Sequence, residues 1–418
     1  MNFKKLLKIL GPGLLYAGAA VGVSHLVQST RAGASYGFDL LWILILANVL
    51  KYPFFEFAPR YAIATRDSLI TGYYKIGKWA IIAFTILTLS TMFAIQAAVT
   101  IVTAGLVANV FNLSIDTLPL CSIILGTTMM VLIIGRYAVL DKIIKFIIII
   151  LALSTIIAVI YAFNIPRETP HNLLKGFEWA NRIDIFFLIA FIGWMPAPID
   201  VAVWHSLWTV AKRKEIGFSP TLKESLMDFK IGYIGTAFLA LGFLTLGALV
   251  MYGTGEEFSP NGTVFSEQLI NLYTKSIGKW AYFVIAIAAL ATMFSTTLTC
   301  LDAYPRVLKP TTELIFPVLK NNLRSNNWIS WIWIVILVIG TLILIGYLTS
   351  SMRFMVDLAT TLSFVTAPVL AFMNYKVVTD KHMPSEAKPK LWLKIYAWIG
   401  MIFLSGFTIV YIIWKFFI

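Results

Sequence analysis

Long runs of apolar residues fill most of the chain, and short segments rich in charged residues, Gly, Pro and Asn separate them. A helix needs about 20 apolar residues to cross the hydrocarbon core of a bilayer. Cutting the runs at the polar segments predicts an all-α polytopic membrane protein with eleven transmembrane helices. We expect these spans at residues 10–36, 39–60, 79–107, 116–135, 143–164, 184–210, 229–252, 280–302, 328–348, 354–375 and 392–414.

The composition agrees with this pattern. Hydrophobic residues make up 59% of the 418 residues and charged residues only 13%, with a mean hydropathy of +0.84. Soluble domains are about 45–50% apolar and about 25% charged, so the composition excludes a soluble protein. Disorder is excluded as well, because apolar residues are plentiful.

The net charge of +13 arises from Lys and Arg residues in short loops between apolar runs. Membrane proteins retain such residues on the cytoplasmic side, so the charge indicates a lipid bilayer and no nucleic-acid partner. Most of the 33 Lys and Arg residues lie on one side if the N-terminus is cytoplasmic. We therefore expect a multi-pass protein of the inner (plasma) membrane, with the C-terminus outside.

An internal repeat divides the chain. Residues 76–80 and 277–281 both read Ile-Gly-Lys-Trp-Ala, and Thr-Met-Phe follows at 91–93 and 292–294, with the same offset. The first copy opens the third span from inside and the second opens the eighth span from outside. This opposite orientation predicts an inverted five-plus-five repeat. We expect one unit at 1–165, the second at 166–378, and an additional span within 379–418.

Two spans contain sequences that break helices. Residues 193–200 in the sixth span read Gly-Trp-Met-Pro-Ala-Pro-Ile-Asp, and two prolines so close together cannot belong to an unbroken helix. The corresponding first span contains Gly22 within Ala-Val-Gly-Val-Ser-His. Broken helices at equivalent places in two inverted halves are typical of the substrate site of secondary transporters. We therefore expect a transport site between spans 1 and 6.

Several segments resemble the natural resistance-associated macrophage protein (Nramp) family of metal transporters. They are Gly-Pro-Gly at 11–13, Arg-Ala-Gly-Ala-Ser-Tyr-Gly at 31–37, Leu-Leu-Trp at 40–42, Leu-Ala-Asn at 46–48, Thr-Arg-Asp-Ser-Leu at 65–69, Met-Pro at 195–196 and His-Ser at 205–206. The resemblance implies a LeuT-like fold and proton-linked uptake of a divalent metal.

The metal-binding motifs of that family are altered here. The family has Asp-Pro-Gly-Asn in its first span, and counting from residues 11–13 places Gly22, Val23, Ser24 and His25 at those positions. The Met of its sixth span corresponds to Met195 if the following His is replaced by Ala197, and the Gln of its tenth span corresponds to Thr361. The resemblance therefore implies a divergent member without the usual manganese and iron ligands.

The residues near the two breaks are the candidates for substrate binding. A neutral imidazole ligates transition metals or relays protons, Met is a soft ligand, and a carboxylate within the bilayer must face a cavity or take up a proton. We expect a metal to be bound by His25, Met195 and Asp200, with the carbonyls of Ala20, Val21 and Gly193. The wider substrate site comprises Gly22, Ser24, His25, Trp194, Met195, Ala197, Asp200 and Thr361.

Polar residues elsewhere in the spans are candidates for proton transfer or gating. Glu56 and Arg60 are four residues apart, which places them on one helix face, and Lys51 lies in the same span. The set for a proton path or a gate is His25, Asp200, His205, Arg31, Glu56 and Arg60.

Two substrate classes stay open. The first is a divalent cation. The second is a small organic solute that bears a carboxylate, held by the positive helix N-termini near Ser24 and Ile199. Either would move with a proton or sodium ion. No nucleophile elbow, phosphate loop, zinc-finger spacing or His-Glu-x-x-His motif occurs, so we expect neither an enzyme nor a resident cofactor.

Overall fold

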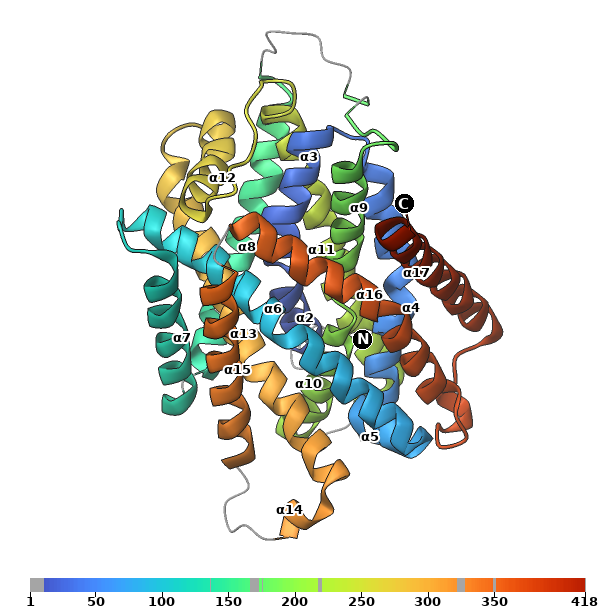
Figure 1. Ribbon diagram of the computed structural model, residues 1–418. Coiled ribbons are helices and arrows are strands. Elements are labelled where there is room, and N and C mark those ends of the chain that lie inside the picture. The colour runs from blue at the N-terminus through green and yellow to red at the C-terminus, as the bar shows by residue number, and fades with distance from the viewer. Residues whose placement is uncertain are drawn as a thin grey trace.

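The computed structural model describes residues 11–135, 137–165, 173–174, 176–216, 220–321, 328–348 and 351–417. Every regular element in this part of the chain is helical (Figure 1). The elements are α2 (Pro12–Ala20), η1 (Ser24–Ser29), α3 (Thr30–Tyr36), α4 (Leu41–Thr65), α5 (Leu69–Ile76), α6 (Lys78–Val110), α7 (Thr117–Ile134), α8 (Tyr137–Ala162), α9 (Arg182–Trp194), α10 (Asp200–Ile216), α11 (Leu222–Val250), α12 (Gly262–Ile277), α13 (Ala281–Ile315), α14 (Pro317–Asn321), α15 (Trp328–Tyr347), α16 (Met352–Thr379), η2 (Ser385–Ala387) and α17 (Leu391–Phe417).

All eleven predicted spans are present in this architecture. Eight of the described helices are long and apolar enough to cross a membrane by themselves: α4, α6, α7, α11, α13, α15, α16 and α17. The fifth span is α8. The first span consists of α2, η1 and α3, and the sixth of α9 and α10, so both are interrupted as the sequence predicts. The chain is thus a multi-pass membrane protein.

Two amphipathic helices lie outside the predicted spans. The helices α5 and α12 each precede one copy of the Ile-Gly-Lys-Trp-Ala repeat. In both copies the glycine has a left-handed backbone conformation, with φ of 143° at Gly77 and 97° at Gly278. Such angles suit glycine because it has no Cβ. The two copies therefore share one local design, an amphipathic helix and a glycine turn followed by a long span.

The long helices α6 and α13 pack against each other near the middle of the molecule (Figure 1). The Gln96 side-chain amide donates to the carbonyl of Thr297 at 3.2 Å, and these two residues are separated by the offset of the repeat. The hydroxyls of Thr103 and Thr297 lie 2.8 Å apart. Equivalent residues of the two copies thus meet at the centre, as an inverted repeat requires. The unit boundaries at 1–165 and 166–378 stay a prediction.

The helix α11 holds both halves of the first span. Its Asp228 carboxylate accepts hydrogen bonds from the backbone N–H groups of Gly11 (3.1 Å) and Gly13 (2.7 Å), at the start of α2. Four such N–H groups have no partner within a helix, and a negative charge there also suits the helix dipole. Beyond the break, glycines let α3 approach α11 closely. A Cβ at Gly247 would lie only 2.3 Å from the carbonyl oxygen of Thr30.

This close approach predicts that even a methyl group at position 247 destabilises the fold. Gly247→Ala should lower the free energy of unfolding by roughly 1–3 kcal/mol, because α3 and α11 must separate. Gly235→Ala is the matched control on α11, since a Cβ there meets no atom within 4 Å. It should be neutral or stabilising by up to about 1 kcal/mol. Thermal unfolding in detergent, followed by tryptophan fluorescence, measures both. Equal melting temperatures would refute the close-packing explanation.

Candidate functional site

The first span is interrupted between Ala20 and Ser24. The carbonyl of Ala20, freed at the end of α2, accepts hydrogen bonds from the backbone N–H of Gly22 (3.0 Å) and the hydroxyl of Ser24 (2.5 Å). A Cβ at Gly22 would lie 2.7 Å from the hydroxyl oxygen of Thr296 in α13. The break therefore lies directly against α13, and its end carbonyl is already satisfied from within the chain.

The sixth span is interrupted between Trp194 and Asp200, and the Met195–Pro196 peptide within the interruption is cis. The last turn of α9 is capped by a side chain from another span. The ammonium of Lys51, in α4, donates to the carbonyls of Ile192 (2.5 Å) and Gly193 (2.9 Å). The carbonyl of Gly193, expected above as a metal ligand, thus binds an internal cation.

A small cavity of about 20 Å³ lies between the two breaks. This is room for about one water molecule. Of the expected substrate residues, Ser24 and Trp194 line it. The full lining is Ala19, Ala20, Val23 and Ser24 from the first span, Trp194, Pro198, Val201 and Trp204 from the sixth, Ile95 and Val99 from α6, and Thr296 and Cys300 from α13.

The polar groups of this cavity are few. The hydroxyl of Thr296 donates to the carbonyl of Thr292 (3.0 Å), which leaves its oxygen as an acceptor. The hydroxyl of Ser24 has one proton and two partners within hydrogen-bond distance, the carbonyl of Ala20 and Nδ1 of His25 (2.7 Å). Most of the other lining side chains are aliphatic or aromatic. The cavity is thus apolar, with two hydroxyl oxygens able to accept from a water molecule or contact a cation.

His25 lies beside the cavity and is fully buried. Its Nε2 lies 2.9 Å from the carbonyl of Thr236 in α11, and a carbonyl only accepts, so Nε2 carries a proton. Its Nδ1 lies 2.7 Å from the hydroxyl of Ser24. Both ring nitrogens are therefore engaged, and the imidazole links the first span to α11.

Asp200 opens α10 and is also buried, but it faces a different helix. Its carboxylate lies 3.5 Å from the hydroxyl of Thr91 in α6. Met195 and Ala197 are fully buried within the break. Among the described residues, no group of three or more His, Cys, Asp or Glu side chains is arranged to hold a metal ion. The structure thus gives His25 and Asp200 separate partners.

His205 and Thr361 lie away from these contacts. The ring of His205 is buried against Tyr16 and Phe229, with centroids 6.0 and 5.6 Å away. Thr361 is half-buried, whereas the adjacent Thr360 is fully buried. The hydroxyl of Thr360 accepts from the side-chain amide of Gln28 at 3.5 Å. In the same span, the hydroxyl of Ser363 accepts from the Trp194 indole at 2.7 Å. Counting along the sequence did not identify Thr360 and Ser363.

An ion pair connects the first and tenth spans on the α3 side of the cavity. The guanidinium of Arg31 donates to both carboxylate oxygens of Asp357, at 2.8 and 3.3 Å, and to the side-chain oxygen of Gln28 at 3.0 Å. It also stacks over the ring of Phe187 in α9, 5.0 Å from the centroid. Arg31 therefore connects α3 to α16 and α9.

Glu56 and Arg60 form the pair that their spacing predicts. The guanidinium of Arg60 donates to the Glu56 carboxylate at 2.5 and 3.2 Å and to the carbonyl of Ala387 at 3.1 Å. Ala387 belongs to η2, in the connection between α16 and α17. The pair thus links α4 to that connection rather than to the cavity.

An aromatic cluster lies on the α10 side of the cavity. The indole of Trp204 packs edge-on against Tyr304 (5.1 Å between centroids) and Trp208 (6.3 Å). Trp204 lines the cavity, whereas Trp208 lines a larger hollow of about 710 Å³ between α7, α10, α13 and α15. These rings therefore separate the cavity from the larger hollow.

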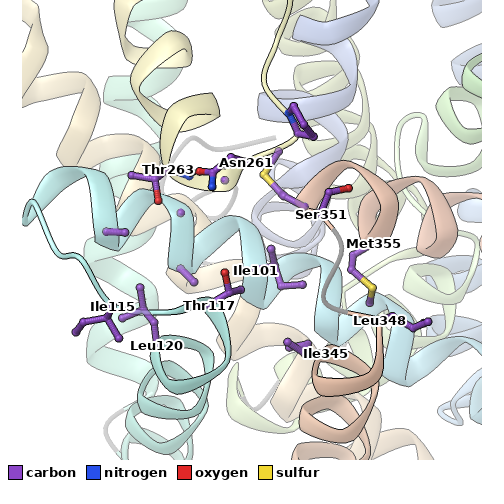
Figure 2. Close-up of a pocket in the computed structure, with 16 residues that line it drawn as sticks. Ile101, Ile115, Thr117, Leu120, Asn261, Thr263, Ile345, Leu348, Ser351 and Met355 are labelled. Atoms are coloured by element: carbon purple, nitrogen blue, oxygen red, sulfur yellow. Dashed lines mark hydrogen bonds between the residues drawn. The ribbon is translucent and has the colours of Figure 1, made fainter.

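A third hollow, of about 210 Å³, lies apart from the two breaks (Figure 2). The beginnings of α7, α12 and α16 surround it, together with α6 and the end of α15. Figure 2 shows Thr117, Asn261, Ser351 and Met355 among its lining side chains. None of the expected site residues lines it.

Comparison with known proteins shows which family this chain is similar to. Residues 13–414 match the model of the natural resistance-associated macrophage protein-like family. An uncharacterized protein of Pasteurella multocida is 36% identical over 406 residues, covering 96% of this chain and 91% of the relative. The divalent metal cation transporter MntH of Staphylococcus saprophyticus is 24% identical over 432 residues, covering 99% and 93%.

Solved structures agree on the fold. A crystal structure of the Eremococcus coleocola manganese transporter, in complex with an aromatic bis-isothiourea substituted compound, superposes with a TM-score of 0.68 at 15% identity. The match covers 98% of this chain and 86% of that one. The fold is therefore LeuT-like, with the inverted repeat and broken helices expected from the sequence.

The aromatic cluster generates a prediction about access to the cavity. Cys300 lines the cavity and Cys121 is the second cysteine of the chain, so a Cys121→Ala background leaves Cys300 as a reporter. In this background, Trp204→Ala should raise the rate of Cys300 modification by N-ethylmaleimide roughly tenfold or more. The reagent reaches a buried thiol only when the structure opens locally, and removal of the indole makes this opening unnecessary. Trp79→Ala, at an exposed tryptophan, is the control. An unchanged rate in Trp204→Ala would show that the ring does not close the cavity.

Proposed function

Because the chain belongs to the natural resistance-associated macrophage protein-like family, we propose that it is a secondary transporter that takes up a divalent metal cation together with a coupling ion. The observation that carries this proposal is the cavity between two interrupted helices in inverted halves of the chain. Transporters of this architecture bind their substrate at such a place. Relatives named as divalent metal cation transporters support the substrate class.

We further propose that the cation keeps part of its water. The usual first-span carboxylate position is Gly22, and the cavity contributes the hydroxyl oxygens of Ser24 and Thr296. Hydroxyl, carbonyl and water oxygens suit hard cations such as Mg²⁺, which loses its water reluctantly. Weak or absent manganese transport follows from this donor set. His25 and Asp200 remain the side chains proposed to contact the cation or its water when the neighbouring helices move.

Asp200 is proposed to carry the coupling proton. It is a buried carboxylate at the start of α10, and its neighbour in α6 is the neutral hydroxyl of Thr91. An ionised carboxylate within the bilayer is costly unless it has a partner, so a proton or a cation stabilises it there. His205, further along α10, is proposed to continue the proton path toward the inner side.

Alternating access is proposed to use two barriers. The Arg31–Asp357 pair closes one side and the Trp204 cluster the other. With the N-terminus cytoplasmic, as the positive-inside distribution suggests, the ion pair is the outer barrier and the aromatic cluster the inner one. Glu56 and Arg60 are proposed to keep α4 and the η2 connection together during the change.

The alternative substrate, a carboxylate-bearing organic solute, is favoured by the apolar character of the cavity wall. Trp194, Trp204 and Ile95 supply a surface that an organic side chain would contact. The volume of about 20 Å³ argues for an ion in this conformation, since it accepts about one water molecule. A thermal-shift screen against divalent metals and common metabolites separates the two classes, because a ligand that binds the folded state raises its stability.

Uptake into proteoliposomes tests the proposed function. We expect saturable, proton-linked Mg²⁺ uptake and little manganese uptake, and Asp200→Asn should abolish the proton dependence because it removes the titrating carboxylate. Glu256→Gln, at an exposed residue paired with Lys275, is the control. Saturable manganese uptake at micromolar concentration, unchanged in His25→Ala and Asp200→Ala, would show that the site lies elsewhere. Absence of any divalent uptake, with a stabilising organic ligand in the thermal screen, would favour the solute.

The outer barrier gives a separate prediction. Asp357→Asn should weaken the pair with Arg31, because a neutral amide loses the charge-assisted, two-pronged hydrogen bond. A membrane-impermeant thiol reagent added outside should then modify Cys300 faster, by roughly tenfold if the pair contributes about 1.4 kcal/mol to closure. Glu256→Gln is again the matched control, since it breaks an exposed pair. Equal rates in Asp357→Asn and the parent would contradict the role of this pair.

A further inference from the structure

A lysine side chain occupies the carbonyl end of the broken sixth span. Lys51 is fully buried in α4, and its ammonium donates to the carbonyls of Ile192 and Gly193 at 2.5 and 2.9 Å. These carbonyls belong to the last turn of α9, which ends at Trp194. The end of a helix carries roughly half a negative charge from such carbonyls. The lysine therefore places its amino group, which is positively charged when protonated, at the negative end of the half-helix.

The equivalent end in the first span is treated differently. The carbonyl of Ala20, at the end of α2, receives the hydroxyl of Ser24 and the backbone N–H of Gly22, which are neutral donors. The two breaks face one cavity, but only the one in the sixth span is capped by a charge. Hydrogen bonding alone does not need an ammonium, because neutral donors suffice at Ala20. The two ends therefore differ in the chemical class of their donor.

The charge lies close to the cavity. Gly193, which accepts from the ammonium, is followed directly by Trp194, whose side chain lines the cavity. Lys51, Ile192 and Gly193 do not themselves line the cavity, so a charge on Lys51 acts on the cavity across the segment that carries Trp194. Charges interact more strongly inside a protein than in water. A divalent cation in the cavity would thus be repelled by a protonated Lys51.

We propose that the ammonium of Lys51 is a tethered cation that fills the cation position at the carbonyl end of α9 and thereby limits the affinity of the cavity for divalent metals. This inference rests on the proposed function only in taking a cation as the substrate. It makes Lys51 a specificity-determining residue: its charge favours a hydrated, weakly held cation over one bound directly by backbone oxygens.

Three substitutions separate the charge from the hydrogen bonds. Lys51→Arg keeps both, Lys51→Gln keeps a donor without the charge, and Lys51→Met removes both at similar length. The dissociation constants of the purified protein for Mg²⁺ and for Mn²⁺, each added alone, are measured by isothermal titration calorimetry. Melting temperature with and without each cation is the second readout. Lys75→Gln, which removes a half-exposed lysine paired with Asp67, is the matched control.

We expect the affinity for divalent cations to follow the charge. Lys51→Gln should bind roughly tenfold more tightly than the parent, and Lys51→Met more tightly still because the carbonyls of Ile192 and Gly193 lose the lysine donor. Lys51→Arg and Lys75→Gln should bind like the parent. If Lys51→Met lowers the melting temperature, a divalent cation should restore it. A purely structural lysine predicts lost stability that no cation restores.

The possible outcomes distinguish this inference from the proposed function. The role of Lys51 would be overturned if Lys51→Gln and Lys51→Met bound divalent cations with the same affinity as the parent or more weakly. This holds even if the parent transports a divalent cation. A parent that binds neither cation would count against the proposed function. In that case, a gain of saturable binding in Lys51→Gln or Lys51→Met would still support the role of Lys51 as a tethered cation. If neither the parent nor any variant binds either cation, the inference fails as well. If Lys51→Met does not fold, the comparison of Lys51→Gln with Lys51→Arg decides whether the charge limits the affinity.

Discussion

The interruption of two helices in the middle of the membrane is the constraint on which the site depends. Within the bilayer no bulk water satisfies a freed carbonyl, so each interrupted end needs a donor from the protein itself. At the end of α2 the donors are the hydroxyl of Ser24 and the N–H of Gly22; at the end of α9 the donor is Lys51. Both ends are therefore satisfied from within the protein, and a cation would have to compete with these donors for the same oxygens.

The spans were predictable because length and hydropathy decide whether a helix crosses the bilayer, and the breaks because proline and glycine act locally. The helices α5 and α12 were not predicted. They are short and have a polar face, so a search for continuous runs of apolar residues does not find them. A signal existed for α12, where Asn261 precedes the helix and accepts from its first N–H groups. Contacts such as Asp228 with Gly11 and Gly13 join residues far apart in sequence, so spacing contains no information on them.

Of the expected substrate residues, Ser24 and Trp194 line the cavity between the breaks, and the direction of the other side chains could not be predicted from the sequence. His25 and Asp200 lie at the breaks, yet one contacts α11 and the other α6. Residues 24–29 form a π-helix, whose wider turn rotates the following side chains relative to an α-helix. In the tenth span, Thr360 rather than Thr361 contacts Gln28, a difference of one residue that changes the helix face by about 100°. Neither rotation is encoded in the spacing of polar residues.

The polar contacts at the site fall into two groups that differ in what a conformational change must do to them. Lys51 with α9 connects spans 2 and 6, and His25 with α11 and Asp228 with α2 connect spans 1 and 7. Arg31 with Asp357 and Asp200 with Thr91 connect spans 1 and 6 to spans 10 and 3. Alternating access in inverted-repeat transporters is largely a rigid-body movement of one bundle against the other. The first group can move as a unit with its hydrogen bonds intact, whereas the second must break or rearrange. Asp357 and Asp200 give these two contacts a carboxylate, whereas Gln28 with Thr360 and Trp194 with Ser363 join spans 1 and 6 to span 10 through neutral groups. Protonation of Asp200 or separation of the Arg31 pair would therefore change the energy of the proposed movement directly.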